Sequence, residues 1–430
     1  MTHRFIVGGG PLYDGRALHP DGAMLVDDGA VAALGPVEAI RRHHEAPFID
    51  VRGRLIVPGF LNAHTHLYSS LAAGLAPLGS TDTFRQTLTN LWWPLDAAHD
   101  EESIYYSALI GIMGHIRAGT TTIFDHHASM NSVCGSLEII AGAVRECGVR
   151  ATLCFETSER TGRKAVSDHI AENVDFFEAN RHDAFVGGTM GLHASLTLGD
   201  ESLSEIAASR PVDMPIHVHV GEAPEDLHAG THDGSEGPID RLCEHRLLDE
   251  HSLLVHAIHL SHRDTALLAE IEPQVVVAPQ SNANNGVGHP DPVSVPRYLI
   301  GTDGMSADMI ETLRYQHLFL RSVRAPQAAL RDAVFEHAAR ARSHHFPGTG
   351  RLFVGSRADA VVLDYAPVTE LHEDNLVDHL VFGAKRAVAH MTIVDGRVLF
   401  ENGRFTGLDE DRIRSHARRV AAKLHARFYG

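Results

Sequence analysis

The amino-acid sequence predicts an α/β protein: a (β/α)8 TIM barrel with a small β-sandwich domain built from both ends of the chain. Three observations lead to this prediction. Short apolar runs alternate with helical segments through the middle of the chain, polar residues follow most of these runs, and strand pairs joined by tight turns occur near both ends. The 430 residues suffice for a barrel of roughly 250 to 300 residues and a smaller domain.

Eight apolar runs supply the predicted barrel strands. The first spans residues 55–63, and a helix that opens at Asp100 and ends at Gly119 follows it, with apolar residues at every fourth position. Parallel strands need such crossover helices, and eight strand–helix units favour a closed barrel. The other runs cover residues 121–124, 151–155, 190–192, 216–220, 253–255, 275–278 and 298–300.

Both ends of the chain are rich in short strands. Residues 5–57 and residues 360–400 each contain strands that flank an Asp-Gly turn, the pattern of a hairpin. Neither end has enough strands to cover a hydrophobic face by itself, so we expect the two ends to combine. The expected division is a composite β-sandwich domain from residues 1–57 and 349–430, a barrel from residues 58–348, and a surface helix at residues 409–428.

The composition disfavours several classes of partner. There are 37 Lys and Arg against 55 Asp and Glu, a formal net charge of −18, which disfavours binding to a nucleic acid polymer or to an anionic membrane. The four cysteines form neither a CxxC pair nor a disulfide framework, and no apolar run is long enough to span a membrane. Glycines interrupt the N-terminus too early for a signal peptide. We therefore expect a cytoplasmic protein with free thiols.

The first barrel strand ends in a pair of histidines, His64 and His66. Side chains two residues apart in a strand point to the same side, so both imidazoles can reach one point. This spacing predicts half of a metal site. The alternative is a solvated loop end in a chain that contains 32 histidines.

Further candidate residues follow later strands, whose C-terminal ends meet at one face of a parallel barrel. His219 offers a third ligand and Asp303 a fourth, and three His with one Asp leave a coordination position for water, as in a catalytic site. Glu222 then has the position of a general acid/base. The alternatives are a surface carboxylate for Glu222 and ordinary barrel-lining histidines for His193 and His256. His217 should point away from the site.

The chain closely resembles the amidohydrolase superfamily, in its cytosine- and adenosine-deaminase-like branch. The motifs PGFLNAHTH, GTTTIFD, HVHVGE, LLVHAIHL, APQSNAN, IGTDG, RADAVVLD and IVDGRVL carry the resemblance almost from end to end. It implies a distorted (β/α)8 barrel with a split β-sandwich. It also implies one Zn²⁺ or Fe²⁺ bound by His64, His66, His219 and Asp303. The resemblance further implies that Glu222 transfers protons, and that His256 orients the attacking hydroxide or polarises the leaving group. It implies that His193 contacts the substrate.

Two local features refine the resemblance. Segments Leu91-Trp92-Trp93 and Asp125-His126-His127 are similar to the aminohydrolase subgroup called SsnA. Binuclear relatives bridge two metals with a carboxylated lysine after the fourth strand, and none of the three lysines of this chain occupies that position. We therefore expect a mononuclear site. Candidates for substrate contact are His126, Trp92 and Trp93, and the alternative is that these side chains only pack. A third hypothesis is a second, weaker metal held by His126 and His127.

The sequence thus predicts a metal-dependent hydrolase that deaminates a small nitrogen heterocycle such as a purine or a pyrimidine. In an alternative function, the same site cleaves a cyclic amide or a ureide, or displaces another leaving group. A non-catalytic relative is a third hypothesis, which the complete set of candidate residues disfavours. We also expect a homo-oligomer.

Overall fold

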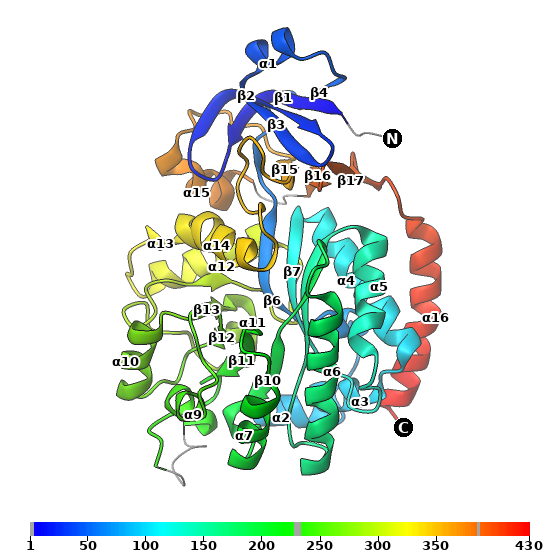
Figure 1. Ribbon diagram of the computed structural model, residues 1–430, viewed down its shortest axis with the longest axis vertical. Helices are drawn as coiled ribbons and strands as arrows, with labels where there is room; N and C mark the ends of the chain where they lie inside the picture. The colour runs from blue at the N-terminus through cyan, green and yellow to red at the C-terminus, as the bar shows by residue number, and fades with distance from the viewer. Residues whose placement is uncertain (1–3, 228–233, 385–387) are drawn as a thin grey trace.

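A computed structural model describes residues 4–227, 234–384 and 388–430 (Figure 1). A mixed sheet lies at one end of the molecule, and parallel strands surrounded by helices form the larger part below it. The C-terminal helix α16 (Glu410–Phe428) runs along the outside of that larger part. It corresponds to the helix expected from the Arg-rich tail.

The larger part contains two parallel sheets. Isolated parallel bridges join them at both edges, between Thr157 and Leu192 and between Thr65 and Asp303, so that the described strands form a ring. The prediction of an α/β fold with parallel strands is confirmed. One sheet contains β6 (Phe60–Thr65), β7 (Thr120–His127), β8 (Arg150–Phe155) and β9 (Val186–Gly188), and the other contains β10 (Met190–Ala194), β11 (Ile216–Val220), β12 (Leu253–His256), β13 (Gln274–Val277) and β14 (Leu299–Ile300).

The first expected barrel strand is in fact two strands. β5 (Ile56–Pro58) belongs to the mixed sheet, and β6 begins after Gly59. A Cβ atom on Gly59 would lie 2.1 Å from a side-chain carbon of Thr121, so only glycine lets the chain pass β7 this closely. The apolar run is continuous because both strands are buried, and hydrophobicity therefore could not reveal the break.

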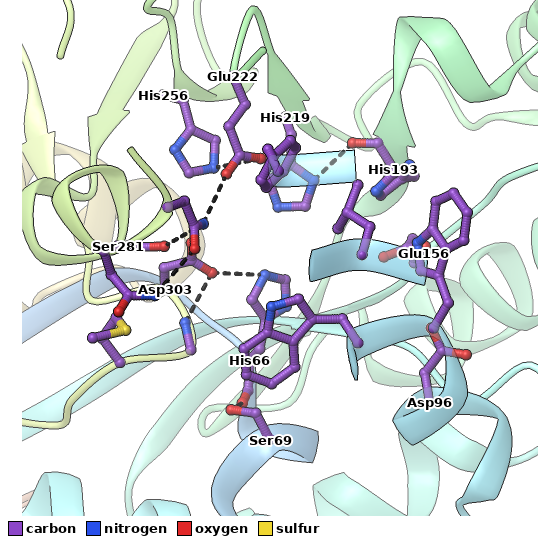
Figure 2. A pocket seen from close by; sticks show the side chains of 18 of the residues that line it. His66, Ser69, Asp96, Glu156, His193, His219, Glu222, His256, Ser281 and Asp303 are labelled. Carbon is purple, nitrogen blue, oxygen red and sulfur yellow. Dashed lines mark hydrogen bonds and ion pairs between the residues drawn. The ribbon is translucent and has the colours of Figure 1, made fainter. Parts of the chain in front are cut away.

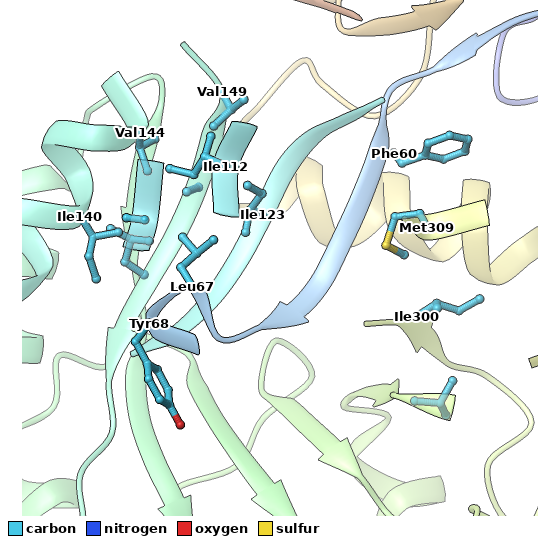
Figure 3. Close-up of a cluster of buried hydrophobic side chains, with 14 of the residues drawn as sticks. Phe60, Leu67, Tyr68, Ile112, Ile123, Ile140, Val144, Val149, Ile300 and Met309 are labelled. Atoms are coloured by element: carbon cyan, nitrogen blue, oxygen red, sulfur yellow. The ribbon is translucent and has the colours of Figure 1, made fainter. Parts of the chain in front are cut away.

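Helices cover the outside of the parallel strands. Asp100 caps α4 (Glu101–Arg117) in a reciprocal capping box with Ser103, and the fourfold-spaced apolar residues of this helix are buried against the strands, as predicted. Figure 3 shows Ile112 of α4 near Ile123 of β7 in this core.

The remaining α-helices are α1 (Val37–His43), α2 (Phe84–Thr87), α3 (Trp93–Ala98), α5 (Ser136–Cys147), α6 (Val166–Asn180), α7 (Asp200–Ser209), α8 (Pro224–Leu227), α9 (Pro238–Glu244), α10 (His262–Ile271), α11 (Pro279–Asn285), α12 (Met309–Ser322), α13 (Ala329–Arg331), α14 (Ala338–His345) and α15 (Leu376–Asp378). Shorter or wider helical turns are η1 (Leu67–Leu71), η2 (Leu88–Trp92), η3 (Arg163–Ala165), η4 (Ser195–Thr197), η5 (Asp332–His337), η6 (Glu373–Asn375) and η7 (His379–Gly383).

The mixed sheet contains strands from both ends of the chain. β5 pairs with β15 (Ala360–Leu363) in antiparallel register, with Val57 opposite Val361. The path of the sheet is β18-β17-β16-β15-β5-β1-β2-β3, and β4 also pairs with β1. Its other members are β1 (Phe5–Tyr13), β2 (Leu18–Asp27), β3 (Ala30–Pro36), β4 (Phe48–Asp50), β16 (Ala389–Val394), β17 (Arg397–Glu401) and β18 (Arg404–Phe405).

A buried charge network ties the mixed sheet to the parallel strands. Arg150 of β8 donates from Nε to Asp359 at 2.9 Å and from Nη2 to Asp395 at 2.8 Å. The side chains of Arg150 and Asp359 are 2% and 1% exposed, so neither charge has water to solvate it and each depends on the other.

Two further findings concern the class of the protein. Within the described ranges, no helix combines the length and the apolar character needed to cross a lipid bilayer. All four cysteines are free thiols, and Cys147 and Cys154 are buried.

Candidate metal centre and catalytic pocket

The ends of three strands bring four candidate ligands together. His64 lies within β6 and His66 directly after it, His219 lies in β11, and Asp303 follows β14. The backbone holds the first and last of these strands in fixed register, because the amides of Thr302 and Asp303 both donate to the carbonyl of His64 at 3.0 Å. The face predicted from the parallel arrangement is therefore the face on which the ligands meet.

The spacing of the donor atoms fits one metal ion. Oδ1 of Asp303 lies 3.0 Å from Nε2 of His66 and 3.7 Å from Nε2 of His64, and the Nε2 atoms of His64 and His219 are 3.3 Å apart. Donor atoms about 2.1 Å from a common Zn²⁺ at tetrahedral angles lie roughly 3.4 Å from one another. The four side chains therefore have the chemistry and the separation of a zinc site.

The opposite ring nitrogens fix which atoms face the cluster. Nδ1 of His66 donates to the carbonyl of His126 at 2.6 Å, and Nδ1 of His219 donates to the carbonyl of His193 at 2.7 Å. Nδ1 of His64 lies 2.9 Å from Nε2 of His217. In the neutral ring with the proton on Nδ1, Nε2 is left with a lone pair that can bind a metal ion.

The electrostatics of the cluster also attract positive charge. Burial opposes ionisation of Asp303, yet its hydrogen bonds to His64 and His66 hold its pKa well below the usual value. Burial likewise disfavours a charged His66, but the adjacent Asp303 raises the pKa of His66 to about 9. Burial dominates at His64 and lowers its pKa to about 4.

Glu222 and His256 lie beside His66, His219 and Asp303 (Figure 2). Oε2 of Glu222 is 3.4 Å from Nε2 of His256, and Nδ1 of His256 donates to Oδ1 of Asn282 at 2.8 Å. Asn285 donates to the other oxygen of Glu222 at 3.4 Å. Burial raises the pKa of Glu222 to about 7, which places its carboxyl in the range suited to both accepting and returning a proton.

A cavity opens over this cluster. Three of the four residues proposed from sequence for substrate contact line it, namely His193, Trp92 and Trp93. His126 is fully buried, does not line the cavity, and donates from Nε2 to the carbonyl of Leu192 at 3.0 Å. β7 continues to His127, beyond the expected end at residue 124. The His126 ring packs against the rings of His66, His217 and His219. This geometry favours the packing alternative for His126.

The sequence reasoning did not single out a polar group on the other side of the cavity. Glu156 follows β8 and lines the cavity with Asp96 of α3. Arg160 bonds to both carboxylates. The available signal was a carboxylate directly after a barrel strand, the same signal that identified Asp303.

A comparison of the sequence with protein-family models identifies the family. The model for the amidohydrolase family matches residues 55–399. The chain belongs to the amidohydrolase family. As an amidohydrolase it matches, at 30% identity over 96% of its own length and 97% of the relative, the 5-methylthioadenosine/S-adenosylhomocysteine deaminase of Halobacterium salinarum. The predicted superfamily is thereby confirmed; the SsnA subgroup stays a prediction.

Solved structures share the fold of this amidohydrolase. An adenosine deaminase from Xanthomonas campestris with bound zinc superposes with a TM-score of 0.87 at 21% identity, over 98% of each chain. An atrazine chlorohydrolase from Arthrobacter aurescens complexed with zinc superposes with a TM-score of 0.77 at 20% identity, over 97% of this chain and all of the other. At these identities the likeness concerns the fold.

Proposed function

We propose that this protein is a zinc-dependent hydrolase that releases ammonia from an amino-substituted nitrogen heterocycle. The observation that carries the proposal is the convergence of three imidazoles and one carboxylate beside Glu222 and His256, at the floor of a cavity. A hydrolase acting on carbon–nitrogen bonds agrees with the deaminase names of its relatives.

The proposed roles follow from the geometry. His64, His66, His219 and Asp303 would hold the zinc, which when bound would supply a water of lowered pKa. Glu222 would accept a proton from the attacking water on a carboxylate oxygen and return it to the departing amine. His256, whose Nδ1 is fixed by Asn282, would direct Nε2 at the same reacting group. His193, Trp92 and Trp93 would hold the ring by hydrogen bonding and stacking.

The leading alternative retains these residues and changes the leaving group. One structural neighbour is an atrazine chlorohydrolase, and cleavage of a cyclic amide or ureide would use the same acid/base residue. A non-catalytic role is disfavoured because the ligands and Glu222 are all present. Iron in place of zinc is an alternative for the metal.

One experiment separates these functions. Purified protein with zinc restored would be assayed on aminopurines, aminopyrimidines, cyclic ureides and chlorotriazines, with ammonia, ring-opened product and chloride measured in parallel. Ammonia release supports the proposal, whereas ring opening or chloride release without ammonia contradicts it. Elemental analysis of the protein before zinc is restored distinguishes zinc from iron and tests the expected single equivalent per chain.

The division of the chain into domains is also a proposal. We infer that the ring of parallel strands is the distorted (β/α)8 barrel of residues 58–348, and that residues 1–57 and 349–430 form a β-sandwich domain. The pairing of β5 with β15 supports the union of the two ends. A homo-oligomer and a cytoplasmic location stay predictions, which gel filtration and cell fractionation would test.

A further inference from the structure

The cavity wall opposite Asp303 is built from acidic side chains. Figure 2 shows Glu156, Asp96 and His193 on one side of the pocket, with Asp303 and Ser281 on the other. Glu156 is 4% exposed and Asp96 is 1% exposed. Two carboxylates are thus placed in the wall that a bound ring would face on the side away from Asp303.

Arg160 holds this wall in place from behind. Its Nη1 donates to Oδ2 of Asp96 at 3.0 Å, its Nη2 donates to Oε1 of Glu156, and its guanidinium lies 5.0 Å from the ring centre of Trp93. Arg160 itself does not line the cavity. Its donors are therefore not offered to a ligand in this cavity.

The wall has acceptor capacity left over. Within the described residues, the hydrogen bonds to the carboxylate of Glu156 use Oε1 alone, and Oδ1 of the buried Asp96 has no partner. Burial opposes the ionisation of Glu156, but the charge of Arg160 lowers its pKa below the usual value. An ionised carboxylate accepts hydrogen bonds and cannot donate them.

Among the described residues that line the cavity, none is a lysine or an arginine that could pair with an acidic substrate. A phosphate or carboxylate on the substrate would therefore meet carboxylates without a compensating charge, apart from the metal at the reacting end.

We infer that Glu156, held by Arg160, is a specificity-determining residue whose Oε2 accepts a hydrogen bond from a ring N–H or amino group of the substrate. The preferred substrates are accordingly neutral or cationic heterocycles with such a donor and without a phosphate or carboxylate. The inference rests on the proposed deaminase function and names the substrate class of the same pocket.

The test compares each amino-heterocycle with its ring N-methyl counterpart, and each nucleoside with its 5′-monophosphate. A hydrogen bond to a charged group contributes about 1.5 to 3 kcal/mol, so removing the N–H should lower kcat/KM by about 10- to 100-fold, mainly through KM. Adding the 5′-phosphate should lower kcat/KM by at least as large a factor. Equal kcat/KM values within these pairs would overturn the inference.

Glu156→Gln supplies the matched variant. Its amide oxygen can still accept a hydrogen bond but carries no charge, so kcat/KM should fall by about 10-fold on the N–H substrate and little on the N-methyl substrate, whereas a purely structural role would lower both alike. Glu159→Gln is the control, because Glu159 lies in the same segment, accepts from Gly199 at 2.8 Å and does not line this cavity. If Glu156→Gln does not fold, Glu156→Asp keeps the charge and shortens the reach, with the same expected contrast.

A binding measurement separates this inference from the proposed function. Calorimetry on Glu222→Gln protein would compare N–H rings with N-methyl rings without turnover. If the wild type releases no ammonia but the N–H rings bind at least about 10-fold more tightly, the proposed function fails and the role of Glu156 stands. Ammonia release combined with equal binding overturns the role of Glu156 and leaves the function intact.

Discussion

Nε2 of His217 lies 2.9 Å from Nδ1 of His64, on the side of the His64 ring turned away from the other ligands. Both rings are fully buried. For Nε2 of His64 to bind a metal, the proton of this ring must be on Nδ1, and Nε2 of His217 must accept the hydrogen bond from it. The proton of His217 is then on its Nδ1, which lies 3.7 Å from Sγ of Cys154.

His217→Leu should therefore lower the affinity for zinc by about 10- to 100-fold, because the ring of His64 loses the partner that fixes its tautomer. Competition with a chelator measures this directly on protein of verified fold. His217→Gln, which can still accept through its amide oxygen, should recover part of the affinity. Equal zinc affinity in the wild type and the Leu variant would show that the contact is only packing.

Glu222→Gln should retain zinc and lose kcat by a factor of about 10² to 10⁴, the usual range for a lost general acid/base. The carboxylate lies beside His256, and its loss removes the group that we propose carries the proton to the amine. Steady-state kinetics with parallel elemental analysis give both readouts. A fully active variant would remove Glu222 from the mechanism.

Asp359→Asn should cost about 3 to 5 kcal/mol of unfolding free energy, since it leaves the charge of Arg150 buried with one carboxylate fewer. Chemical denaturation in excess zinc is the measurement. Asp364→Asn is the matched control: Asp364 pairs with Arg54 at 2.9 Å but its side chain is 59% exposed, so its loss should cost less than about 1 kcal/mol. Similar losses of unfolding free energy at Asp359 and Asp364 would show that burial does not strengthen the Arg150–Asp359 pair.

His115 should make stability depend on pH. Its Nδ1 donates to the carbonyl of Gly111 at 2.8 Å and its Nε2 faces the amide nitrogen of Asn62 at 2.8 Å, so only the neutral ring fits. Burial lowers its pKa to about 4, below the unfolded value of about 6.5. The unfolded chain therefore binds the proton first, and the stability present above pH 6.5 is lost as the pH falls towards 4.

The expected loss from this one group is at most about 1.4 kcal/mol per pH unit within that window. His115→Gln should flatten the decline of unfolding free energy between pH 6.5 and 4, and His43→Gln on the surface is the control. Denaturation curves at several pH values in excess zinc provide the slopes. Parallel slopes for the wild type and His115→Gln would refute the assignment.

The convergence of the four candidate ligands could be predicted because it depends on two regularities of strands. Alternate residues of a strand share a face, which placed His64 with His66, and parallel strands end at one face, which added His219 and Asp303. The break at Gly59 could not be predicted, since it depends on how closely β7 passes. The position of Glu156 directly after β8 was a signal in the sequence, but its pairing with Arg160 is recognisable only once both side chains are placed.

The antiparallel pairing of β5 with β15 has a consequence for synthesis on the ribosome. Val57 finds its partner Val361 only after roughly 300 further residues are made, which takes roughly 15 to 60 s at usual elongation rates. During that interval the buried edge of β5 has no strand beside it, and closing so long a loop carries an entropic cost of about 5 kcal/mol. The nascent chain must therefore protect an open, apolar strand edge until nearly all of the protein has emerged.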